Sequence, residues 1–363
     1  MPTARIASIA CARTTSTLTD APLTILVTAV GSPGTVALLR ALRDNGERPV
    51  RLVGTDMRDE AVGRFRCDAF AIVPAGSDPA FAGAILALAQ REGVDVVLPQ
   101  ASFDLERLAE ARADFEAAGI TLLCASPEAV RAADSKYDTL VLCERLGVRA
   151  PAFRLAKGGA QVVAAARELG YPERDVCMKP VVASGSRGFH IISTRVDRRQ
   201  QLLHERPGAM PLRLEDVERI LGDDQTELLV MELVAGSERT VDGYAERGRI
   251  VLAHPKTREA MRSGLAMRFE TLDNPQLIGV AKTLVEGFDL DGFFNLQLIG
   301  DAVLEMNPRI STIVYQPNFN LPWLGIRRAL GLLTDDEAVT AQARVQPGRI
   351  AIRYFDQLEY GPL

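Results

Sequence analysis

The sequence predicts an α/β protein whose N-terminal part is a parallel, doubly wound sheet. Residues 23 to about 125 alternate short apolar stretches with amphipathic ones, a pattern typical of parallel strands that helices connect. Beyond residue 175, apolar stretches follow one another across short glycine-containing turns, which indicates antiparallel strand pairs. A length of 363 residues is compatible with two or three domains.

Composition indicates a soluble globular protein. Hydrophobic residues make up 47% and charged residues 25% of the chain, which is ample for a sizeable core. The net charge of −5 argues against nucleic acid or an anionic membrane surface as a partner. No apolar run approaches the ~20 residues that a membrane span needs.

Cysteine and histidine usage excludes several chemistries. The five cysteines are scattered, odd in number and without a Cys-x-x-Cys pair, so neither a disulfide framework nor a zinc site is indicated. Reduced, mostly buried thiols fit a cytoplasmic protein. Only three histidines occur, and no pair has metal-ligand spacing, which disfavours chemistry built on a histidine base.

Residues 1–22 are expected to form a disordered tail. They carry Arg5 and Arg13 among alanine, serine and threonine, which leaves a weak transit-like segment as the alternative. The first domain is therefore expected over residues 23–130.

This first domain is expected to be Rossmann-like. Its strands are predicted at Leu23 to Ala29, Val50 to Asp56, Asp68 to Pro74, Val94 to Gln100 and Ile120 to Leu123. The first turn, Gly31-Ser32-Pro33-Gly34, opens a helix through Arg43 but is not Gly-x-Gly-x-x-Gly. Dinucleotide binding stays an alternative, because Asp56 lies about where a ribose-binding acid would be.

A helix start near residue 135 carries a lysine in an unusual place. Ser135-Lys136-Tyr137-Asp138 reads as a capping box, in which Ser135 bonds the Asp138 backbone and Asp138 bonds back. Lys136 then lies in the first turn, beside the positive end of the helix dipole. That position is reasonable if an anion also binds there, and a solvated surface lysine is the alternative.

A second lysine lies inside an apolar strand. Lys179 belongs to the strand Val176 to Val182 and must reach a partner or water. The loop that follows, residues 183–188, is rich in glycine and serine and can aim several backbone N–H groups at phosphate oxygens. Loop and lysine together predict a phosphate site better than the loop alone.

The rest of the chain alternates strands, helices and one basic segment. Helices are expected at Ala160 to Leu169 and Asn274 to Gly287, and strands at Phe189 to Ser193, Glu227 to Val234, Glu238 to Ala245, Ile250 to Ala253 and near Ile350 to Phe355. Residues 255–268 are basic and loop-like, with Lys256, Arg258 and Arg262. They are candidates to bind an anionic substrate, and a solvated basic loop is the alternative.

The stretch from Gln297 to Arg309 is the most informative part of the sequence. Glu305 and Asn307 are two positions apart, so a strand puts both side chains on one face, and Arg309 follows if the chain stays extended past Pro308. Hard divalent cations such as Mg²⁺ prefer oxygen ligands and usually share them with substrate phosphates. These residues therefore predict a metal site.

Strand register decides whether Gln297 can share this metal. Cross-strand partners of an antiparallel pair lie on the same face. A two-residue turn at Gly300-Asp301 would pair Gln297 with Leu304 and turn Glu305 away. A three-residue turn pairs Gln297 with Glu305, so we predict the three-residue turn, against the general preference for tight two-residue hairpins.

Taken together, these segments resemble the ATP-grasp ligases over Leu23 to about Tyr354. The resemblance rests on order: a Rossmann-like domain, a lysine at a helix start, a strand lysine before a Gly/Ser loop, a Met-Glu-Leu-Val hinge and a metal hairpin. It is nearest to the carbamoyl-phosphate-synthetase-like and carboxylate–amine ligase branch, whose hairpin also carries a glutamine, as Asn295-Leu296-Gln297 does. It implies a small lid subdomain over residues 131–230 and a C-terminal subdomain over 231–363, which sandwich ATP.

The resemblance also implies roles for individual residues. The ATP phosphates would be held by Lys136 and Lys179 and covered by Ser184, Gly185, Ser186, Arg187 and Gly188. Adenine would meet backbone groups of Met231, Glu232 and Val234, and the ribose would meet Glu238. The ligands of Mg²⁺ (or Mn²⁺) would be Gln297, Glu305 and Asn307. Arg309 would face the transferring phosphoryl group or the acyl phosphate, and the substrate carboxylate would meet Lys256, Arg258 and Arg262.

Two features depart from the family pattern. Arg187 occupies a position at which many relatives have a small residue, and it can add a phosphate or substrate contact. Gln297 with Glu305 replaces the acidic pair of some relatives. Fewer negative charges then face the metal, which leaves open whether one or two ions bind.

The implied activity is an ATP-dependent ligase that converts a small carboxylate to an acyl phosphate, which an amine then attacks. Small-molecule acids and amines are the expected partners, and a homodimer is allowed. Three alternatives remain: a carbamoyl-phosphate-type synthase acting on bicarbonate, a nucleotide-dependent oxidoreductase that uses the N-terminal sheet, and a nucleotide-binding regulatory protein without turnover.

Overall fold

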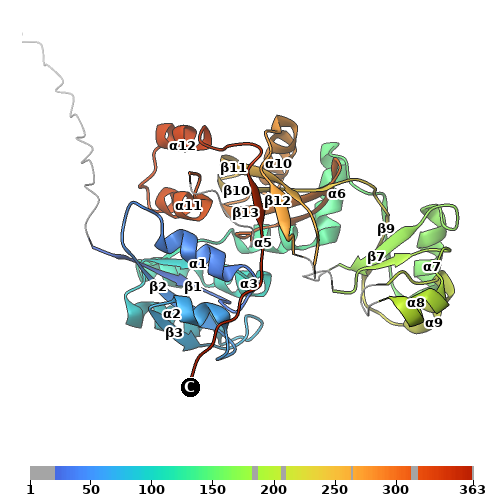
Figure 1. Ribbon diagram of the computed structural model, residues 1–363, viewed down its shortest axis with the longest axis horizontal. Coiled ribbons are helices and arrows are strands. Elements are labelled where there is room, and N and C mark those ends of the chain that lie inside the picture. The colour runs from blue at the N-terminus through green and yellow to red at the C-terminus, as the bar shows by residue number, and fades with distance from the viewer. Residues whose placement is uncertain (1–20, 182–186, 206–209, 263–264, 312–317, 362–363) are drawn as a thin grey trace, which may run out of the picture.

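The computed structural model describes residues 21–181, 187–205, 210–262, 265–311 and 318–361 (Figure 1). Residues 1–20 of the expected tail, and the loop residues Ser184, Gly185 and Ser186, lie outside these ranges. Within the described ranges, no helix is both long enough and apolar enough to cross a bilayer.

The N-terminal part is a parallel sheet of five strands in the order β3-β2-β1-β4-β5. The strands are β1 (Leu23–Val27), β2 (Val50–Asp56), β3 (Ala69–Ile72), β4 (Val96–Leu98) and β5 (Thr121–Leu122). The helical segments are α1 (Thr35–Arg43), the 3₁₀ helix η1 (Val62–Arg66), α2 (Phe81–Glu92), α3 (Ser102–Glu110) and α4 (Arg112–Ala117). All five residues of β1 are buried, as expected for a strand covered on both faces, and the predicted fold class is confirmed.

A small antiparallel sheet forms a separate lobe at the right of Figure 1. Its order is β6-β9-β7-β8, built from β6 (Phe153–Ala156), β7 (Val176–Pro180), β8 (His190–Ile192) and β9 (Leu228–Glu232). Helices α7 (Gly158–Glu168) and α9 (Leu214–Leu221) pack against it, and α8 (Arg198–His204) lies beside them. The boundary expected between residues 230 and 231 falls inside β9, which pairs with both β6 and β7.

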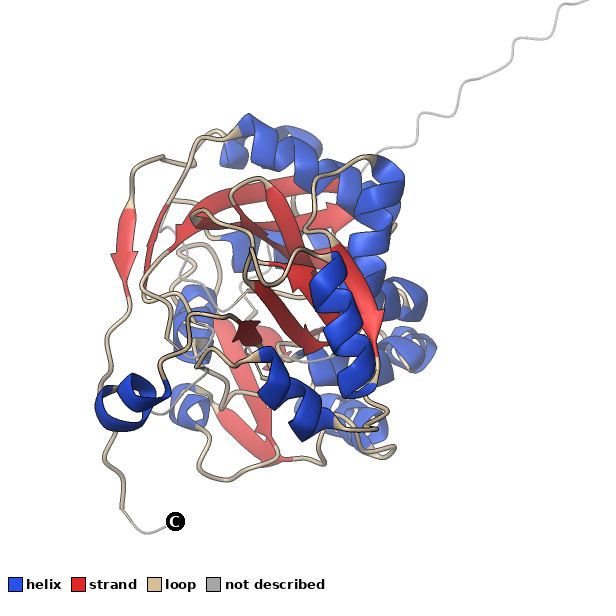
Figure 2. Ribbon diagram, turned by 90° about the vertical axis from the view of Figure 1, so that its right-hand side faces the viewer, coloured by secondary structure: helices blue, strands red, loops and turns tan. Residues whose placement is uncertain are grey.

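A larger antiparallel sheet completes the core, in the order β11-β10-β13-β14. Its strands are β10 (Glu238–Glu246), β11 (Arg249–Arg258), β13 (Gly292–Ile299) and β14 (Ala302–Asn307). The helices of this part are α5 (Pro127–Asp134), α6 (Lys136–Leu146), α10 (Pro275–Gly287), α11 (Leu321–Ala329) and α12 (Asp335–Gln342). In Figure 2 most helices lie around the outside and most strands lie between them, although one strand runs along the edge of the view. One apolar cluster runs from Leu26 and Val97 of the N-terminal sheet to Val241 and Leu296 of the larger one, so the two parts share a core.

The basic segment is not a loop at its start, which corrects the sequence-based expectation. Strand β11 continues to Arg258, and the side chain of Lys256 has no exposed surface. Its Nζ lies 2.7 Å from Oδ2 of Asp242 on β10, a residue that is also buried. Because Lys256 is enclosed and paired within the sheet, it is not available to a substrate carboxylate.

The C-terminal segment leaves the larger sheet and returns to the N-terminal domain, as the dark red trace in Figure 1 shows. Strand β12 (Arg268–Glu270) pairs with β15 (Ile350–Ile352). The segment then reaches the N-terminal domain, where the rings of Tyr360 and Phe65 lie 4.8 Å apart. A cavity of about 900 Å³ lies between this segment and α1.

Candidate functional site

Three basic side chains from three elements act on the carboxylate of Glu305 in β14. The Nζ atom of Lys136 lies 3.7 Å from Oε2 of Glu305. Burial alone would raise the pKa of Glu305, but the charges of Lys136, Lys179 and Arg258 and a hydrogen bond from Asn307 hold it below its usual range. The site therefore carries an excess of positive charge, which suits a polyanionic ligand.

Helix α6 positions Lys136. The Ser135 hydroxyl caps the helix by accepting from the Asp138 amide at 3.2 Å. The Asp138 side chain was expected to accept a hydrogen bond from the Ser135 amide. That amide instead donates to the Arg131 carbonyl of α5. The Lys136 amide donates to the Val181 carbonyl at 3.4 Å, just beyond β7. This contact ties the positive end of α6 to the strand that carries the second lysine.

Strand β7 carries Lys179 into a largely enclosed position. Burial lowers the pKa of Lys179, and the nearby cation of Lys136 adds to that effect, whereas Glu305 opposes it. Beyond the loop, Gly188 has a φ of +71°, and a Cβ built there would meet Cδ of Pro180 at 2.6 Å. The chain thus folds back tightly on the end of β7, and glycine is the residue that fits this approach.

The predicted three-residue turn between β13 and β14 is wrong, although the pairing that it was meant to produce is confirmed. Only Gly300 and Asp301 form the turn, and Gly300 has a φ of +58°. A β-bulge follows, in which Leu304 is the unpaired extra residue. The bulge restores the register, so Gln297 pairs with Glu305.

The residues on this face fit a hard divalent cation. The Gln297 Nε2 atom donates to Asn295 Oδ1 at 3.0 Å, and Asn307 Nδ2 donates to Glu305 Oε1 at 3.1 Å. The amide nitrogens are thus engaged within the protein, which leaves the amide oxygens to join the carboxylate as ligands. In the described part of the chain, no group of three or more His, Cys, Asp or Glu residues offers an alternative metal centre.

Arg309 connects the hairpin to the N-terminal domain. Its Nε donates to the hydroxyl of Ser102, the first residue of α3, at 3.1 Å. Ser102 also forms a hydrogen bond with Asp134 at the end of α5. Burial raises the pKa of Asp134, whereas the charges of Lys136 and Arg309 act to lower it. Sequence reasoning missed Ser102 and Asp134, because no local pattern marks two polar residues that only folding brings to Arg309.

The expected adenine-binding residues lie where β9 ends. Met231 is paired on both sides, with Phe153 and Cys177, and is 3% exposed, so its backbone lies within the sheet. The Glu232 amide donates to the Ala152 carbonyl at 2.8 Å. Val234 follows β9 in the connection to β10, beyond the ladder. Of the three, Val234 is the one that the structure leaves outside strand pairing.

The two candidate arginines have different neighbours. Arg258 is the cross-strand partner of Glu238, the expected ribose ligand, and its Nε lies 3.4 Å from Glu238 Oε2. Arg262 lies with its guanidinium carbon 4.7 Å from the ring centroid of Phe355 in the C-terminal segment. Arg258 therefore belongs with the residues around Glu305, and Arg262 with the C-terminal segment.

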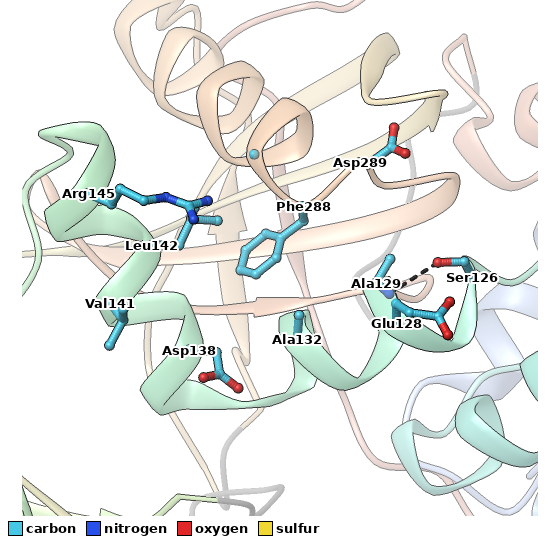
Figure 3. A pocket seen from close by; sticks show the side chains of 11 residues that line it. Ser126, Glu128, Ala129, Ala132, Asp138, Val141, Leu142, Arg145, Phe288 and Asp289 are labelled. Atoms are coloured by element: carbon cyan, nitrogen blue, oxygen red, sulfur yellow. Dashed lines mark hydrogen bonds between the residues drawn. The ribbon is translucent and has the colours of Figure 1, made fainter.

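A separate cavity of about 450 Å³ lies beside α5 and α6 (Figure 3). Residues of these two helices and of the end of α10 line it, and Phe288 points toward its centre. Within the described ranges, none of the residues expected to bind nucleotide or metal lines this cavity.

Two families each match a part of the chain. A family described as "ATP-grasp in the biosynthetic pathway with Ter operon" matches residues 224–350, and the PylC-like N-terminal domain matches residues 25–123. The carbamoyl phosphate synthase large chain of Streptomyces griseus is 30% identical over 203 residues, which are 54% of this chain and 18% of that protein. The chain therefore spans about a fifth of the length of the curated relatives that it matches.

Solved structures agree on the fold. The biotin carboxylase of Campylobacter jejuni has a TM-score of 0.60 at 19% identity, covering 86% of this chain and 72% of that one. The L-amino acid ligase of Bacillus licheniformis has a TM-score of 0.59 at 15% identity, covering 92% and 79%. The resemblance is thus confirmed: residues 224–350 match an ATP-grasp family, and the fold is that of solved ATP-grasp enzymes. The N-terminal part of the chain matches the PylC-like N-terminal domain, and the chain is also similar to carbamoyl phosphate synthase large chains.

Proposed function

We propose that this protein is an ATP-dependent ligase that activates a small carboxylate, such as an amino acid, and joins it to an amine. The convergence of Lys136, Lys179 and Arg258 on Glu305 carries the proposal. Three cations around one carboxylate suit a triphosphate that approaches together with a divalent ion.

The nucleotide would lie between the small sheet and the larger one. Lys136 and Lys179 would hold its phosphates, and Glu238 would meet the ribose. Gln297, Glu305 and Asn307 would hold Mg²⁺ or Mn²⁺. When bound, such an ion neutralises charge on the β- and γ-phosphates.

The acid would bind where Arg309 meets Ser102 and Asp134, between the hairpin and the N-terminal domain. A guanidinium presents two parallel donors that match a carboxylate or an acyl phosphate. A carboxylate oxygen attacks the γ-phosphorus and ADP leaves. The amine nitrogen then attacks the acyl carbon and phosphate leaves. The protein contributes position and charge rather than a covalent intermediate of its own.

A bicarbonate-dependent synthase is the second candidate, favoured by the similarity to carbamoyl phosphate synthase large chains. The oxidoreductase alternative is weakened by Asp56. Its two carboxylate oxygens accept from the Gly31 amide at 2.7 Å and from the Arg58 amide at 3.0 Å. These two hydrogen bonds hold the first turn against the end of β2. A ribose that bound Asp56 would have to displace them.

The deciding experiment is a screen for phosphate released from ATP in the presence of Mg²⁺, with amino acids and small acids supplied singly and together with amines. We expect release that requires both an acid and an amine. Release with bicarbonate alone would favour the synthase. Calorimetric binding of NAD without binding of ATP would contradict the ligase.

A further inference from the structure

A buried chain of polar side chains runs across the larger sheet on the same face as the proposed metal ligands. Lys256 Nζ donates to Asp242 Oδ2 at 2.7 Å, and Asn295 Nδ2 donates to Asp242 Oδ1 at 2.6 Å. Asn295 Oδ1 in turn accepts from Gln297 Nε2 at 3.0 Å and from Asn307 Nδ2 at 3.5 Å. The chain crosses the sheet from β11 through β10 and β13 to β14.

The direction of every bond in this chain follows from chemistry. An ammonium group only donates hydrogen bonds, and a carboxylate only accepts them. Asp242 can therefore meet Asn295 only through the amide nitrogen of Asn295, whose second hydrogen goes to Thr240 Oγ1 at 2.6 Å. With both hydrogens engaged, Asn295 must turn its oxygen toward Gln297 and Asn307.

This orientation decides what the two ligand amides present to a metal. Because Gln297 and Asn307 give their nitrogens to Asn295 Oδ1, their oxygens are left for the cation. A reversed Asn295 would offer hydrogens instead of an acceptor. Both ligand amides would then turn, and their NH₂ groups would face the cation.

We propose that the buried pair of Asp242 and Lys256 is a positioning element. Acting through Asn295, the pair makes the amides of Gln297 and Asn307 present their oxygens, rather than their nitrogens, to the metal. The inference deepens the proposed function, since it concerns the same metal site. The pair fits this role because it is enclosed: Asp242 is 1% exposed and Lys256 is not exposed. Water does not compete for these bonds, and partners of metal ligands commonly set ligand orientation.

The test variant is Asp242→Asn, which preserves shape, replaces one acceptor oxygen by a donor NH₂ group and removes the negative charge beside Lys256. Lys256 still donates, so the introduced amide must turn its oxygen to Lys256 and its nitrogen to Asn295. Asn295 must then reverse, and so must the two ligand amides. We expect the affinity for Mn²⁺, measured by electron paramagnetic resonance with saturating ADP, to fall about 10- to 100-fold.

Two further variants distinguish an effect of amide orientation on Mn²⁺ affinity from a loss of folding stability. Thr240→Val removes the other acceptor of Asn295 but leaves Asp242 in place, so Mn²⁺ affinity should stay within about twofold of wild type. The exchanged variant, which combines Asp242→Asn with Asn295→Asp, restores the donor order. Its introduced amide donates to its introduced carboxylate, which accepts from Gln297 and Asn307. It should recover Mn²⁺ affinity to within about threefold of wild type. Thermal unfolding without ligand reports folding of each variant.

The outcomes are distinct. Wild-type affinity in Asp242→Asn, or an exchanged variant more than about tenfold weaker than wild type, overturns the proposal. If Asp242→Asn does not fold, the Mn²⁺ affinity of the exchanged variant alone tests the proposal. If wild-type protein binds no Mn²⁺ with ADP, the metal site of the proposed function fails and this inference with it. If Mn²⁺ binding is normal but no ligase activity is found, the inference stands and only the proposed reaction is contradicted.

Discussion

Gln297 lies directly opposite Glu305 across a hairpin that turns in two residues. A regular hairpin with this turn would place Leu304 opposite Gln297, and the two oxygen-bearing side chains would lie on opposite faces. The β-bulge at Leu304 absorbs the one-residue difference. The tight turn and the shared face are both obtained in this way.

Deleting Leu304 should leave the proposed metal ligands facing one another. Without the extra residue, regular pairing from the two-residue turn puts Gln297 opposite Glu305 directly. We expect Mn²⁺ affinity within about threefold of wild type, a difference below about 0.7 kcal/mol. Deleting Val303 gives the same shortened strand with leucine in place of valine opposite Leu298, so it should keep Mn²⁺ affinity to the same extent. A large loss of affinity on deleting Leu304 would mean that the bulge itself aims Glu305.

Glu305→Gln should abolish turnover while the fold is kept. The substitution is isosteric and removes the one carboxylate among the proposed metal ligands. We expect kcat to fall at least about 100-fold, or about 2.7 kcal/mol, with an unchanged circular dichroism spectrum. Glu270→Gln, which alters a half-exposed ion pair with Arg268, is the control and should stay close to wild type. Near-wild-type turnover in Glu305→Gln would remove this residue from the metal site.

The family resemblance implies that Arg262 contacts the substrate carboxylate, whereas the structure packs its guanidinium on Phe355. If the contact forms, Arg262→Ala should weaken use of the carboxylate substrate far more than ATP binding. Loss of one charge-assisted contact should cost about 1.5–3 kcal/mol in kcat/KM for the acid. Phe355→Leu serves as the control, because it removes the ring under Arg262 and keeps the charge. Equal losses in the two variants would assign Arg262 to packing of the C-terminal segment.

Arg258→Ala should affect both substrates. Arg258 is expected to contact the carboxylate, and it also pairs with Glu238 and lowers the pKa of Glu305. Its loss should therefore raise the Kd for ATP as well as the KM for the acid, each by about 1.5–3 kcal/mol in free energy. An unchanged ATP affinity would show that the contact with Glu238 has no part in nucleotide binding.

The free energy of unfolding should depend on pH through Asp104. This residue accepts from the Thr28 hydroxyl at 2.6 Å, is 6% exposed, and has its pKa raised by burial to about 6. Between about pH 4 and 6 the folded carboxyl holds a proton that the unfolded one has lost, so stability falls as pH rises through this window. Asp104→Asn removes the effect. Its stability relative to wild type should grow by about 2–3 kcal/mol from pH 4 to 7 in urea unfolding, and a pH-independent difference would contradict the assignment.

The sequence alone determined the elements whose pattern is local. Strand β2 was predicted with the bounds that the structure shows, because valine, leucine and threonine concentrated between polar turns mark a strand. Lys136 at a helix start and Lys179 in a strand were recognised for the same reason, since a misplaced charge is visible against its immediate neighbours.

Only the tertiary structure decided the contacts that join distant segments. The bulge at Leu304, the enclosure of Lys256 by Asp242 and the meeting of Arg309 with Ser102 each depend on how strands and domains pair. Periodicity reports which way a side chain points within its own element, but not which residue lies across from it. Register is set by packing over the whole sheet, and so the partners of these polar groups could not be predicted from the chain alone.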